Sequence, residues 1–385
     1  GRARRVVLEL ARSTARSADR GHRLNVSLLY YSGEPGEASV TMKTVVIAPN
    51  WVGDTVLAQP VYEALAVSGR EVTALARPHL HSLLSLMPSV RDVLSRDSSD
   101  ETTVDNLRGQ GFDEAVILPN SFRSAWLPYR AAIPTRWGYG GRFPSWSFRS
   151  PLLKPSVERP RIAGRHQSSD YQELLEAMDV PAPRDWQPRI ALTEEVRATA
   201  RHLLSRAQVS QSPAPLVGLF AGAEFGSSKR WPWRRFVGVA QDLRRARPDV
   251  RLVVVAGPKE LWLAVRIHEE TGKIHPVIGP DLDLGGLAAV LGELDLLVTN
   301  DSGPMHLAAS LGVPCVALFG PTDPSRTRPV GPTHEVLYTD RWCSPCFRRR
   351  CPLLHHRCMR DLTVDQVVER AAAILGSGGH RGAEA

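Results

Sequence analysis

The apolar residues of this chain fall into short runs that alternate with longer stretches of helical composition. In the first half the runs are TVVIAP at 44–49, VTALA at 72–76 and AVILP at 115–119, and helix-compatible sequence follows each of them. Short runs rich in β-branched residues and bounded by turn residues predict buried strands. The first half is therefore predicted to repeat a strand–turn–helix unit.

The same alternation is stronger in the second half. Five runs there predict strands: LVGLFAG (216–222), RLVVVAG (251–257), PVIG (276–279), DLLVTN (295–300) and CVALFG (315–320). Continuous Val- and Leu-rich strands are typical of parallel sheets that helices cover on both faces. Residues 133–165 interrupt the alternation with five prolines and four glycines, so we predict a loop-rich segment or domain edge there.

These elements predict an α/β protein of two Rossmann-like, doubly wound domains that face each other across a cleft. We place the N-terminal domain at 42–190, a proline-flanked linker at 191–212 and the C-terminal domain at 213–376. Residues 1–41 are expected to be a disordered extension and 377–385 a tail. Open parallel sheets bind ligands at the carboxyl ends of their strands, so functional residues are expected in the loops after strands.

Length and composition agree with this picture. The 385 residues are 43% hydrophobic and 23% charged, which is enough for two domains with apolar cores. No uninterrupted apolar run approaches the roughly 18 residues of a membrane-spanning helix. An intrinsically disordered chain, a collagen and a helical membrane protein are therefore excluded.

The net charge of +8 is concentrated in two segments. Residues 1–41 contain seven arginines and four acidic residues, and residues 341–360 contain six arginines and no acidic residue. A local excess of this kind argues against a nucleic-acid-binding protein. It suits phosphates or an anionic lipid surface, with a solvated basic face as the alternative.

The motif NWVGD at 50–54 follows the first predicted strand and begins the first predicted helix. Gly53 permits close backbone approach, and Asp54 lies at the helix N-terminus, where a carboxylate is favoured. Asp54 is therefore either a helix cap or a carboxylate that faces the cleft. In the second case it can serve as a general base.

The loop AGAEFGSSKRWP at 221–232 follows the first strand of the second domain. Free amides, a helix start at Pro232 and Lys229 together predict an anion-binding site, to which we also assign Glu224. The alternative is a solvated turn with incidental charge. The loop lacks the Gly-Lys-Ser/Thr ending of a P-loop.

The segment TNDSGPMHLAASLG at 299–312 carries the most information. Asp301, Ser302 and Gly303 lie at a strand-to-helix turn, and His306 lies in the first turn of the helix. An anionic group could rest on the free amides while Asp301 accepts hydrogen bonds from sugar hydroxyls. The alternative is an aspartate cap with a core histidine. GPTDPSR at 320–326 follows the next strand and is expected to line the same cleft.

The segment VILPNSFRSAW at 116–126 ends a strand of the first domain and places Asn120, Ser121 and Arg123 on the opposite side of the cleft. No GxGxxG follows a strand, and no GxSxG or Ser-His-Asp pattern is present. Hydride transfer and acyl hydrolysis therefore lose support.

Four of the five cysteines lie within sixteen residues, in CSPCFRRRCPLLHHRC. Their crowding and the missing signal segment favour a reducing, intracellular setting over a disulfide scaffold. The alternatives for the cluster are a structural zinc site, iron–sulfur ligation or a metal-free basic loop. The candidate ligands are Cys343, Cys346, Cys351 and Cys358.

Taken together, these segments resemble the bacterial ADP-heptose:lipopolysaccharide heptosyltransferases of type II, in glycosyltransferase family 9. The resemblance rests on VVIAPNWVGDTVLAQPVYEAL, VILPNSFRSAW, GLFAGAEFGSSKRWP and VTNDSGPMHLAASLGVPCVALFGPT, and it extends from Met42 to about Leu375. The cysteine-rich segment, followed by MRDLTVDQV, is similar to only part of this family.

The resemblance implies a GT-B fold and an inverting transfer of L-glycero-D-manno-heptose from ADP-heptose to the first heptose of the lipopolysaccharide inner core. It implies that Asp54 is the general base, that Lys229 binds the diphosphate and that Asp301 with its neighbours holds the donor. The N-terminal domain would hold the acceptor, with Asn120, Ser121 and Arg123 on its side. No cofactor is expected for the chemistry.

The acceptor implied is a phosphorylated, membrane-anchored glycolipid, so a cytoplasmic protein peripheral to the inner face of the cytoplasmic membrane is expected. Two alternatives remain. One is a nucleotide-sugar epimerase of the same fold, and the other is a non-catalytic glycan- or nucleotide-binding protein.

Overall fold

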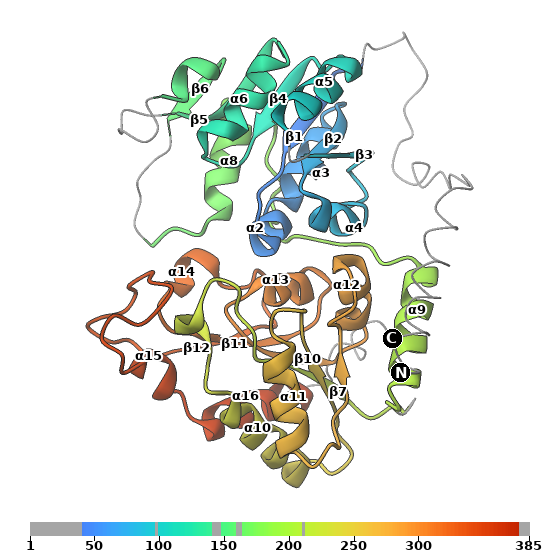
Figure 1. Cartoon of the computed structure of the whole chain (residues 1–385), viewed down its shortest axis with the longest axis vertical. Coiled ribbons are helices and arrows are strands. Elements are labelled where there is room, and N and C mark those ends of the chain that lie inside the picture. The colour runs from blue at the N-terminus through green and yellow to red at the C-terminus, as the bar shows by residue number, and fades with distance from the viewer. Residues whose placement is uncertain (1–40, 97–98, 141–147, 159–163, 210–211, 377–385) are drawn as a thin grey trace. The chain divides into compact units, whose positions relative to one another are not determined.

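The computed structural model describes residues 41–96, 99–140, 148–158, 164–209 and 212–376 (Figure 1). The predicted extension lies outside these residues except for Thr41, and so does the predicted tail at 377–385. Residues from Thr41 onward belong to one compact unit. In the part of the chain that is described, no helix has the length and apolar character needed to cross a membrane.

The first domain is built on six parallel strands in the spatial order β3-β2-β1-β4-β5-β6. The strands are β1 (Lys43–Ile47), β2 (Glu71–Ala76), β3 (Asp92–Ser95), β4 (Glu114–Ile117), β5 (Thr135–Gly140) and β6 (Ser156–Glu158). Its helices are α2 (Val52–Leu57), α3 (Gln59–Val67), α4 (His81–Leu84), α5 (Asp100–Gln110), α6 (Phe122–Arg130) and α8 (Ser168–Ala177).

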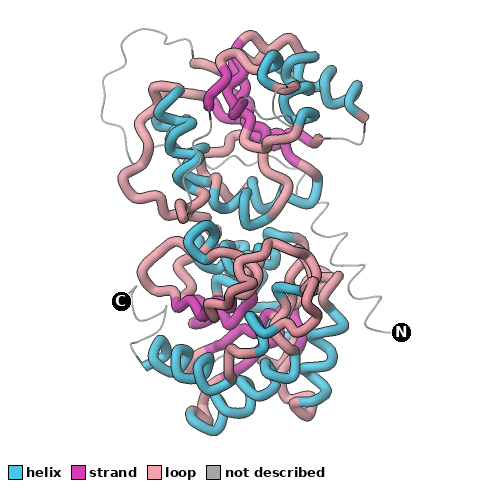
Figure 2. The backbone as a smooth tube through the Cα atoms, turned by 90° about the vertical axis from the view of Figure 1, so that its left-hand side faces the viewer, coloured by secondary structure: helices cyan, strands magenta, loops and turns pink. Residues whose placement is uncertain are grey.

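The second domain repeats this arrangement with the order β12-β11-β10-β7-β8-β9. Its strands are β7 (Leu216–Phe220), β8 (Arg251–Val255), β9 (Val277–Ile278), β10 (Leu296–Asn300), β11 (Cys315–Phe319) and β12 (Glu335–Tyr338). Its helices are α9 (Glu194–Arg206), α10 (Trp233–Ala246), α11 (Leu261–Glu270), α12 (Leu284–Gly292), α13 (Gly303–Ser310), α14 (Pro324–Thr327), α15 (Arg357–Arg360) and α16 (Val364–Gly376). Figure 2 shows helices on both faces of each sheet.

Both sheets have the strand order of a Rossmann fold, in which the direction of winding reverses between the first and the fourth strand. The reversal lies between β1 and β4 in the first sheet and between β7 and β10 in the second. The predicted α/β class with two doubly wound parallel sheets is therefore confirmed. Four of the five loops chosen from the sequence follow these four strands, which is where such sheets bind ligands, and the fifth, at 320–326, follows β11.

The sequence pattern missed the edge strands β3, β6 and β12 and the inner strand β5, whereas the fourth edge strand, β9, was predicted. Residues 133–165, expected to be loop-rich, contain β5 and β6. Edge strands are covered less completely and need fewer apolar residues, so their hydrophobic pattern is weak. The predicted linker 191–212 contains helix α9, which forms because good helix formers occupy positions 194–206 and the prolines lie outside them. Helix α9 packs against α12.

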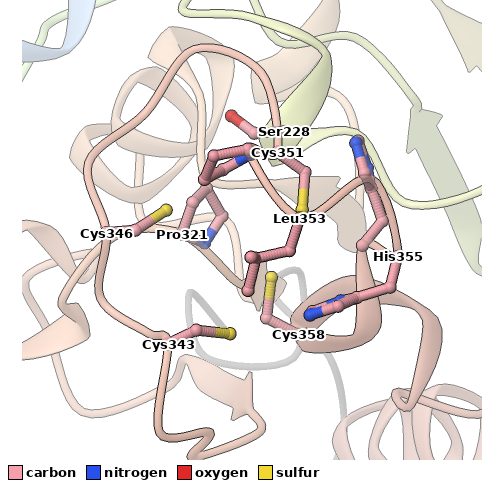
Figure 3. A pocket seen from close by; sticks show the side chains of 10 residues that line it. Ser228, Pro321, Cys343, Cys346, Cys351, Leu353, His355 and Cys358 are labelled. Carbon is pink, nitrogen blue, oxygen red and sulfur yellow. The ribbon is translucent and has the colours of Figure 1, made fainter.

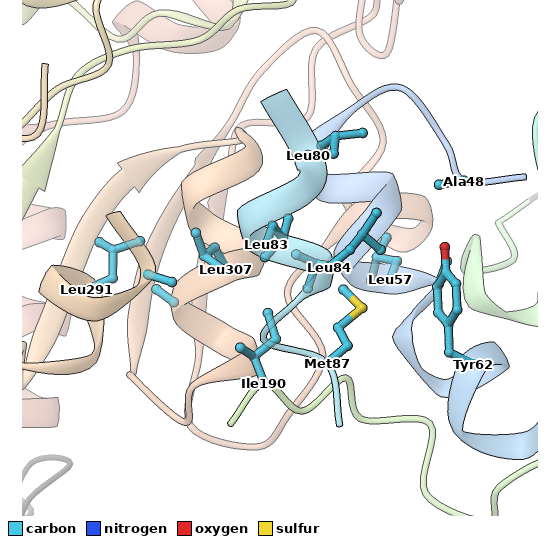
Figure 4. Packing of buried hydrophobic residues seen from close by; sticks show 14 of the residues in the cluster. Ala48, Leu57, Tyr62, Leu80, Leu83, Leu84, Met87, Ile190, Leu291 and Leu307 are labelled. Carbon is cyan, nitrogen blue, oxygen red and sulfur yellow. The ribbon is translucent and has the colours of Figure 1, made fainter. Parts of the chain in front are cut away.

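One apolar cluster is shared between the two sheets. Leu57, Leu83 and Leu84 pack in it together with Leu291 and Leu307, and all five side chains are almost fully buried (Figure 4). They belong to α2 and α4 on one side and to α12 and α13 on the other. Apolar contact of this kind holds α2 and α4 against α12 and α13.

Candidate functional site

Asp54 lies in the first turn of α2, directly after the turn that ends β1. Its side chain is half-buried and accepts a hydrogen bond of 3.2 Å from Gln167 Nε2 to Oδ1. Burial raises the pKa of Asp54, whereas the Gln167 hydrogen bond and the Lys229 charge lower it and the Asp301 charge raises it. Asp54 therefore holds a proton more readily than an ordinary aspartate, which suits a general base.

The start of α2 and the start of α13 are in van der Waals contact. A Cβ atom added to Gly53 would lie 2.7 Å from His306 Cδ2, and one added to Gly303 would lie 2.8 Å from Val52 Cβ. Both glycines are therefore required by close approach. The contact brings the turn after β1 and the turn after β10 together. Each of these two turns is predicted from the sequence to lie at the cleft.

His306 is buried, and its Nδ1 atom has no hydrogen-bond partner within the described residues. Burial, and after it the charges of His166, Lys229 and His334, lowers the pKa of His306 to about 3. The imidazole is consequently neutral at physiological pH. It fills the space between the two helix starts, and it does not supply a positive charge to the site.

Lys229 and Asp301 form the ion pair at the centre of the second-domain side. Lys229 Nζ lies 2.5 Å from Asp301 Oδ2, with side-chain exposures of 12% and 4%. The same Oδ2 atom accepts a hydrogen bond of 2.5 Å from Thr322 Oγ1. An ammonium group has three donors, so Lys229 can contact a phosphate oxygen without leaving Asp301.

Ser302 is the N-cap residue of α13, and Pro304 lies in the first turn, where a missing amide hydrogen costs nothing. The Ser302 side chain makes no capping bond; its hydroxyl instead lies 3.2 Å from Thr299 Oγ1. Lys229 is paired with Asp301, the residue directly before this N-cap. An ammonium group and the positive end of a helix dipole are both groups whose chemistry suits an anion.

Asn300 braces the loop after β7, a role that the sequence reasoning missed. Its Nδ2 donates to the carbonyl groups of Ala221 (2.8 Å) and Gly222 (3.2 Å), and its Oδ1 accepts from the Trp231 amide (3.0 Å). A fully buried, fully bonded amide of this kind fixes both ends of the loop that carries Lys229.

Glu224 lies in the same loop but points toward solvent. It forms a hydrogen-bonded ion pair with Lys259, and the two side chains are 53% and 70% exposed. Their attraction raises the pKa of Lys259, first through the hydrogen bond and then through the charge of Glu224. Glu224 is thus accessible to a ligand but is not part of the Lys229–Asp301 cluster.

The three residues predicted on the acceptor side follow β4. Asn120 Oδ1 is buried and has no hydrogen-bond partner within the described residues. Ser121 caps α6 by accepting from the Ser124 amide at 3.3 Å, and the guanidinium of Arg123 is paired with Asp100, with Nη2 and Oδ1 2.5 Å apart. Of the three, Asn120 therefore has the clearest unused capacity for a ligand.

Gln167 was also missed, because nothing in the local sequence marks it. It precedes α8, and its backbone amide donates at 2.9 Å to the carbonyl oxygen of Arg326 in α14. The neighbouring His166 reaches Arg328 O with Nε2 at 3.1 Å. Contacts with the second domain therefore position the residue that holds the Asp54 carboxylate.

The four clustered cysteines are free thiols and line one small cavity (Figure 3). Cys358 is buried and the other three are half-buried. Burial, and after it the neighbouring thiols of Cys346, Cys351 and Cys343, raises the pKa of Cys358 to about 11. The sequence cluster is therefore a cluster in space as well.

The comparisons with known proteins point in the same direction as this geometry. The family model described as glycosyltransferase family 9 (heptosyltransferase) matches residues 103–356. Lipopolysaccharide heptosyltransferase 2 of Escherichia coli strain K12 is 28% identical over 349 residues, which are 87% of this chain and 99% of that protein.

Two solved structures have the same fold. The structure of the E. coli ADP-heptose LPS heptosyltransferase II has a TM-score of 0.73 and 27% identity, and the match covers 87% of this chain and 99% of that one. A glycosyltransferase of family 9 from Veillonella parvula has a TM-score of 0.76, with 24% identity and coverage of 87% and 97%. The expected GT-B architecture is thereby confirmed.

Proposed function

The chain belongs to glycosyltransferase family 9, the heptosyltransferases, and we propose that it transfers L-glycero-D-manno-heptose from ADP-heptose to the first heptose of the lipopolysaccharide inner core. The names of its relatives support this donor and this acceptor class. Family membership as a glycosyltransferase sets aside the epimerase and the non-catalytic binder considered from the sequence.

One observation carries the proposal. Asp54 of the first domain has a raised pKa and lies close enough to Lys229 and Asp301 of the second domain for both charges to act on it. A base and an anion site supplied by different domains are what an inverting transfer needs. The base and the leaving group then act on opposite faces of the sugar.

The reaction follows from these positions. Asp54 accepts the proton of the acceptor hydroxyl while the hydroxyl oxygen forms a bond to the anomeric carbon of the donor heptose. The bond from that carbon to the β-phosphate oxygen breaks at the same time, and ADP takes both electrons. A positioned base typically contributes about 10²–10⁴ in rate.

The charge that develops on ADP meets the Lys229 ammonium and the amides at the start of α13. Groups fixed in advance at a leaving anion stabilise the transition state by several kcal/mol in typical enzymes, about 2.7–4 kcal/mol for a single donor. Asp301 and Thr322 hold Lys229 in place for this task. These groups all belong to the chain, so we propose that the transfer needs no cofactor.

On the acceptor side we assign Asn120 to a hydroxyl group of the acceptor, because its buried Oδ1 is unpartnered within the described residues. Ser121 and Arg123 lie beside it and complete this side of the proposed site.

We also propose that the protein works at the inner face of the cytoplasmic membrane. Arg348, Arg349 and Arg350 are exposed, and Trp342 and Leu354 beside them are 88% and 83% exposed. Cationic and apolar side chains on one segment suit an anionic lipid surface. Greater sedimentation with anionic than with neutral vesicles would support this proposal; no difference would contradict it.

Incubation of ADP-heptose with a defined acceptor that carries one heptose, followed by mass analysis, tests the function. The expected products are ADP and an acceptor extended by one heptose. The matched control is the same acceptor without its heptose, which should remain unchanged. Extension of the control acceptor alone, or conversion of ADP-heptose without any acceptor, would overturn the assignment.

A further inference from the structure

The loop 343–358, here called the cysteine loop, has no role in the transfer described above. Its four cysteines follow the spacing C-x2-C-x4-C-x6-C. The thiols line a cavity of about 20 Å³ together with Ser228, Pro321 and the two histidines of the loop. A volume of this size holds one water molecule or one ion.

We propose that these four cysteines bind a single metal ion of the thiolate-preferring class, Zn²⁺ or iron, and that this ion fixes the cysteine loop against the loop that carries Lys229. The ligands assigned are Cys343, Cys346, Cys351 and Cys358. Four thiolates at tetrahedral positions form a closed structural site for either metal.

The directions of the cysteine side chains support a common binding site for one ion. In Figure 3 the sulfur atoms of Cys343 and Cys346 turn toward the side where Cys351 and Cys358 lie. Within the described residues, no group of three or more His, Cys, Asp or Glu side chains already has the geometry of a metal site. Binding therefore requires the thiols to lose their protons and close in to about 2.3 Å from the ion.

The histidines of the loop are weaker candidates. His355 Nδ1 accepts a hydrogen bond of 3.0 Å from the Arg357 amide, so this nitrogen is engaged. The four thiols already satisfy the coordination number of a structural site. We therefore assign a site of four cysteines, without a histidine ligand.

The cysteine loop is joined directly to the Lys229 loop. The carbonyl oxygen of Arg349 accepts from the Ser228 amide at 3.2 Å, and that of Arg348 accepts from Ser228 Oγ at 2.5 Å. A Cβ atom added to Gly226 would lie only 2.2 Å from Arg349 O, so the two backbones are in contact. The turn that places Lys229 thus rests on the cysteine loop.

The opposite side of the cysteine loop holds the segment after β11. The amides of Cys346 and Phe347 both donate to Pro321 O, at 3.0 and 2.8 Å. Thr322, which follows Pro321, donates to Asp301. The cysteine loop therefore supports Lys229 through the loop after β7 and supports Asp301 through the segment after β11.

Arg349 extends this support to the first domain. Its guanidinium lies 5.5 Å from the ring centre of Phe225 and 5.9 Å from that of Trp51, the N-cap residue of α2. A metal ion that orders the cysteine loop would therefore also order the contact beside Asp54. This coupling to the site rests on the proposed function, whereas the metal site itself does not.

Metal analysis of the full-length protein purified under reducing conditions tests the site. We expect one equivalent of zinc or iron in the wild-type protein, little in Cys351→Ser, and one equivalent in the matched control Cys315→Ser. Cys315 is a buried thiol in β11, outside the cluster. No stoichiometric metal, an equal loss in both variants, or a disulfide among the four cysteines by mass analysis would overturn the site.

Replacement of the metal by Co²⁺ in the wild-type protein keeps the test independent of how well a variant folds. Absorption bands of thiolate-bound Co²⁺ support the site, and their absence contradicts it. For the coupling, we expect removal of the metal to weaken ADP binding by roughly 5- to 150-fold, the usual range for linked sites. Unchanged ADP affinity in metal-free protein would overturn the coupling, and wild-type protein that holds metal but does not bind ADP would instead contradict the proposed function.

Discussion

The starts of α2 and α13 have the same construction, and they differ in what surrounds their aspartates. Each helix follows a parallel strand at the winding reversal of its sheet, and each has a glycine where the other helix comes close. Asp54 lies inside the first turn of α2, whereas Asp301 comes just before the N-cap of α13.

The partners of the two carboxylates are of different kinds. Asp54 accepts a hydrogen bond from the neutral amide of Gln167, and burial raises its pKa. Asp301 is more deeply buried, but it has the Lys229 ammonium and the Thr322 hydroxyl on one oxygen. A carboxylate without a bonded cation is available to take a proton, while a carboxylate in an ion pair acts by holding the cation.

The largest expected effect is on the first of these carboxylates. Asp54→Asn keeps the acceptor oxygen for Gln167 but removes the base, so turnover should fall by roughly 10²–10⁴-fold. Transfer rates under saturating substrates measure the loss. ADP affinity should be almost unchanged, because Lys229 and the start of α13 are untouched.

Stability separates the loss of a base from a damaged fold. Because the folded-state pKa of Asp54 is raised, its contribution to stability is present below the ordinary pKa and is lost as the pH rises through the folded pKa. At neutral pH, which lies above the ordinary pKa of an aspartate, Asp54 therefore costs stability. Asp54→Asn should unfold at the same or a higher denaturant concentration; retained turnover, or a clear loss of stability, would contradict this account.

The second-largest effect is expected at the ion pair. Lys229→Met removes the cation and leaves Asp301 buried with only a hydroxyl partner, so the free energy of unfolding should fall by about 3–5 kcal/mol. ADP binding should weaken by roughly 10- to 150-fold, equivalent to one hydrogen bond to a charged group. Denaturant unfolding and calorimetric titration with ADP measure the two effects.

A double variant distinguishes the two roles of Lys229. Adding Asp301→Asn to Lys229→Met removes the unpaired charge and should restore most of the lost stability, but it should not restore ADP binding. If the double variant recovered ADP affinity, Lys229 would be a structural partner of Asp301 alone. Asp301 would then no longer act by holding a cation that binds ADP, and the contrast between the two helix starts would be wrong.

Much of this arrangement was predictable from sequence because it is local. Strand runs and the turns after them determine which loops follow β1, β4, β7 and β10, and Rossmann winding places those loops at the ends of the sheets. The partners of the aspartates are less accessible to such reasoning. Gln167 lies 113 positions from Asp54, in a segment without a motif, and only folding brings them together.

The local sequence pattern also did not predict how deeply individual residues are buried. His306 was expected near the donor, and it does lie at the α13 start, but its pKa of about 3 follows from being enclosed by both domains. The edge strands β3 and β12 were missed for the opposite reason, since their partial exposure leaves little apolar pattern. Both cases depend on neighbours that are distant in sequence.

The smallest effect is expected at Gln167, and it sharpens the comparison by changing the pKa of Asp54 without touching the carboxylate. Gln167→Leu removes a hydrogen bond that lowers this pKa, so the acid limb of the pH–rate profile should move to higher pH by about 0.4–1 unit, the worth of one neutral hydrogen bond. Turnover at pH values well above the limb should remain close to that of the wild type, because Asp54 is then ionised in both proteins. Gln167 also donates to Tyr171 OH, at 3.4 Å, so Tyr171→Phe is the matched control and should leave the limb in place. An unmoved limb in Gln167→Leu, with the Tyr171→Phe profile unchanged, would mean that the group titrating in the profile is not Asp54.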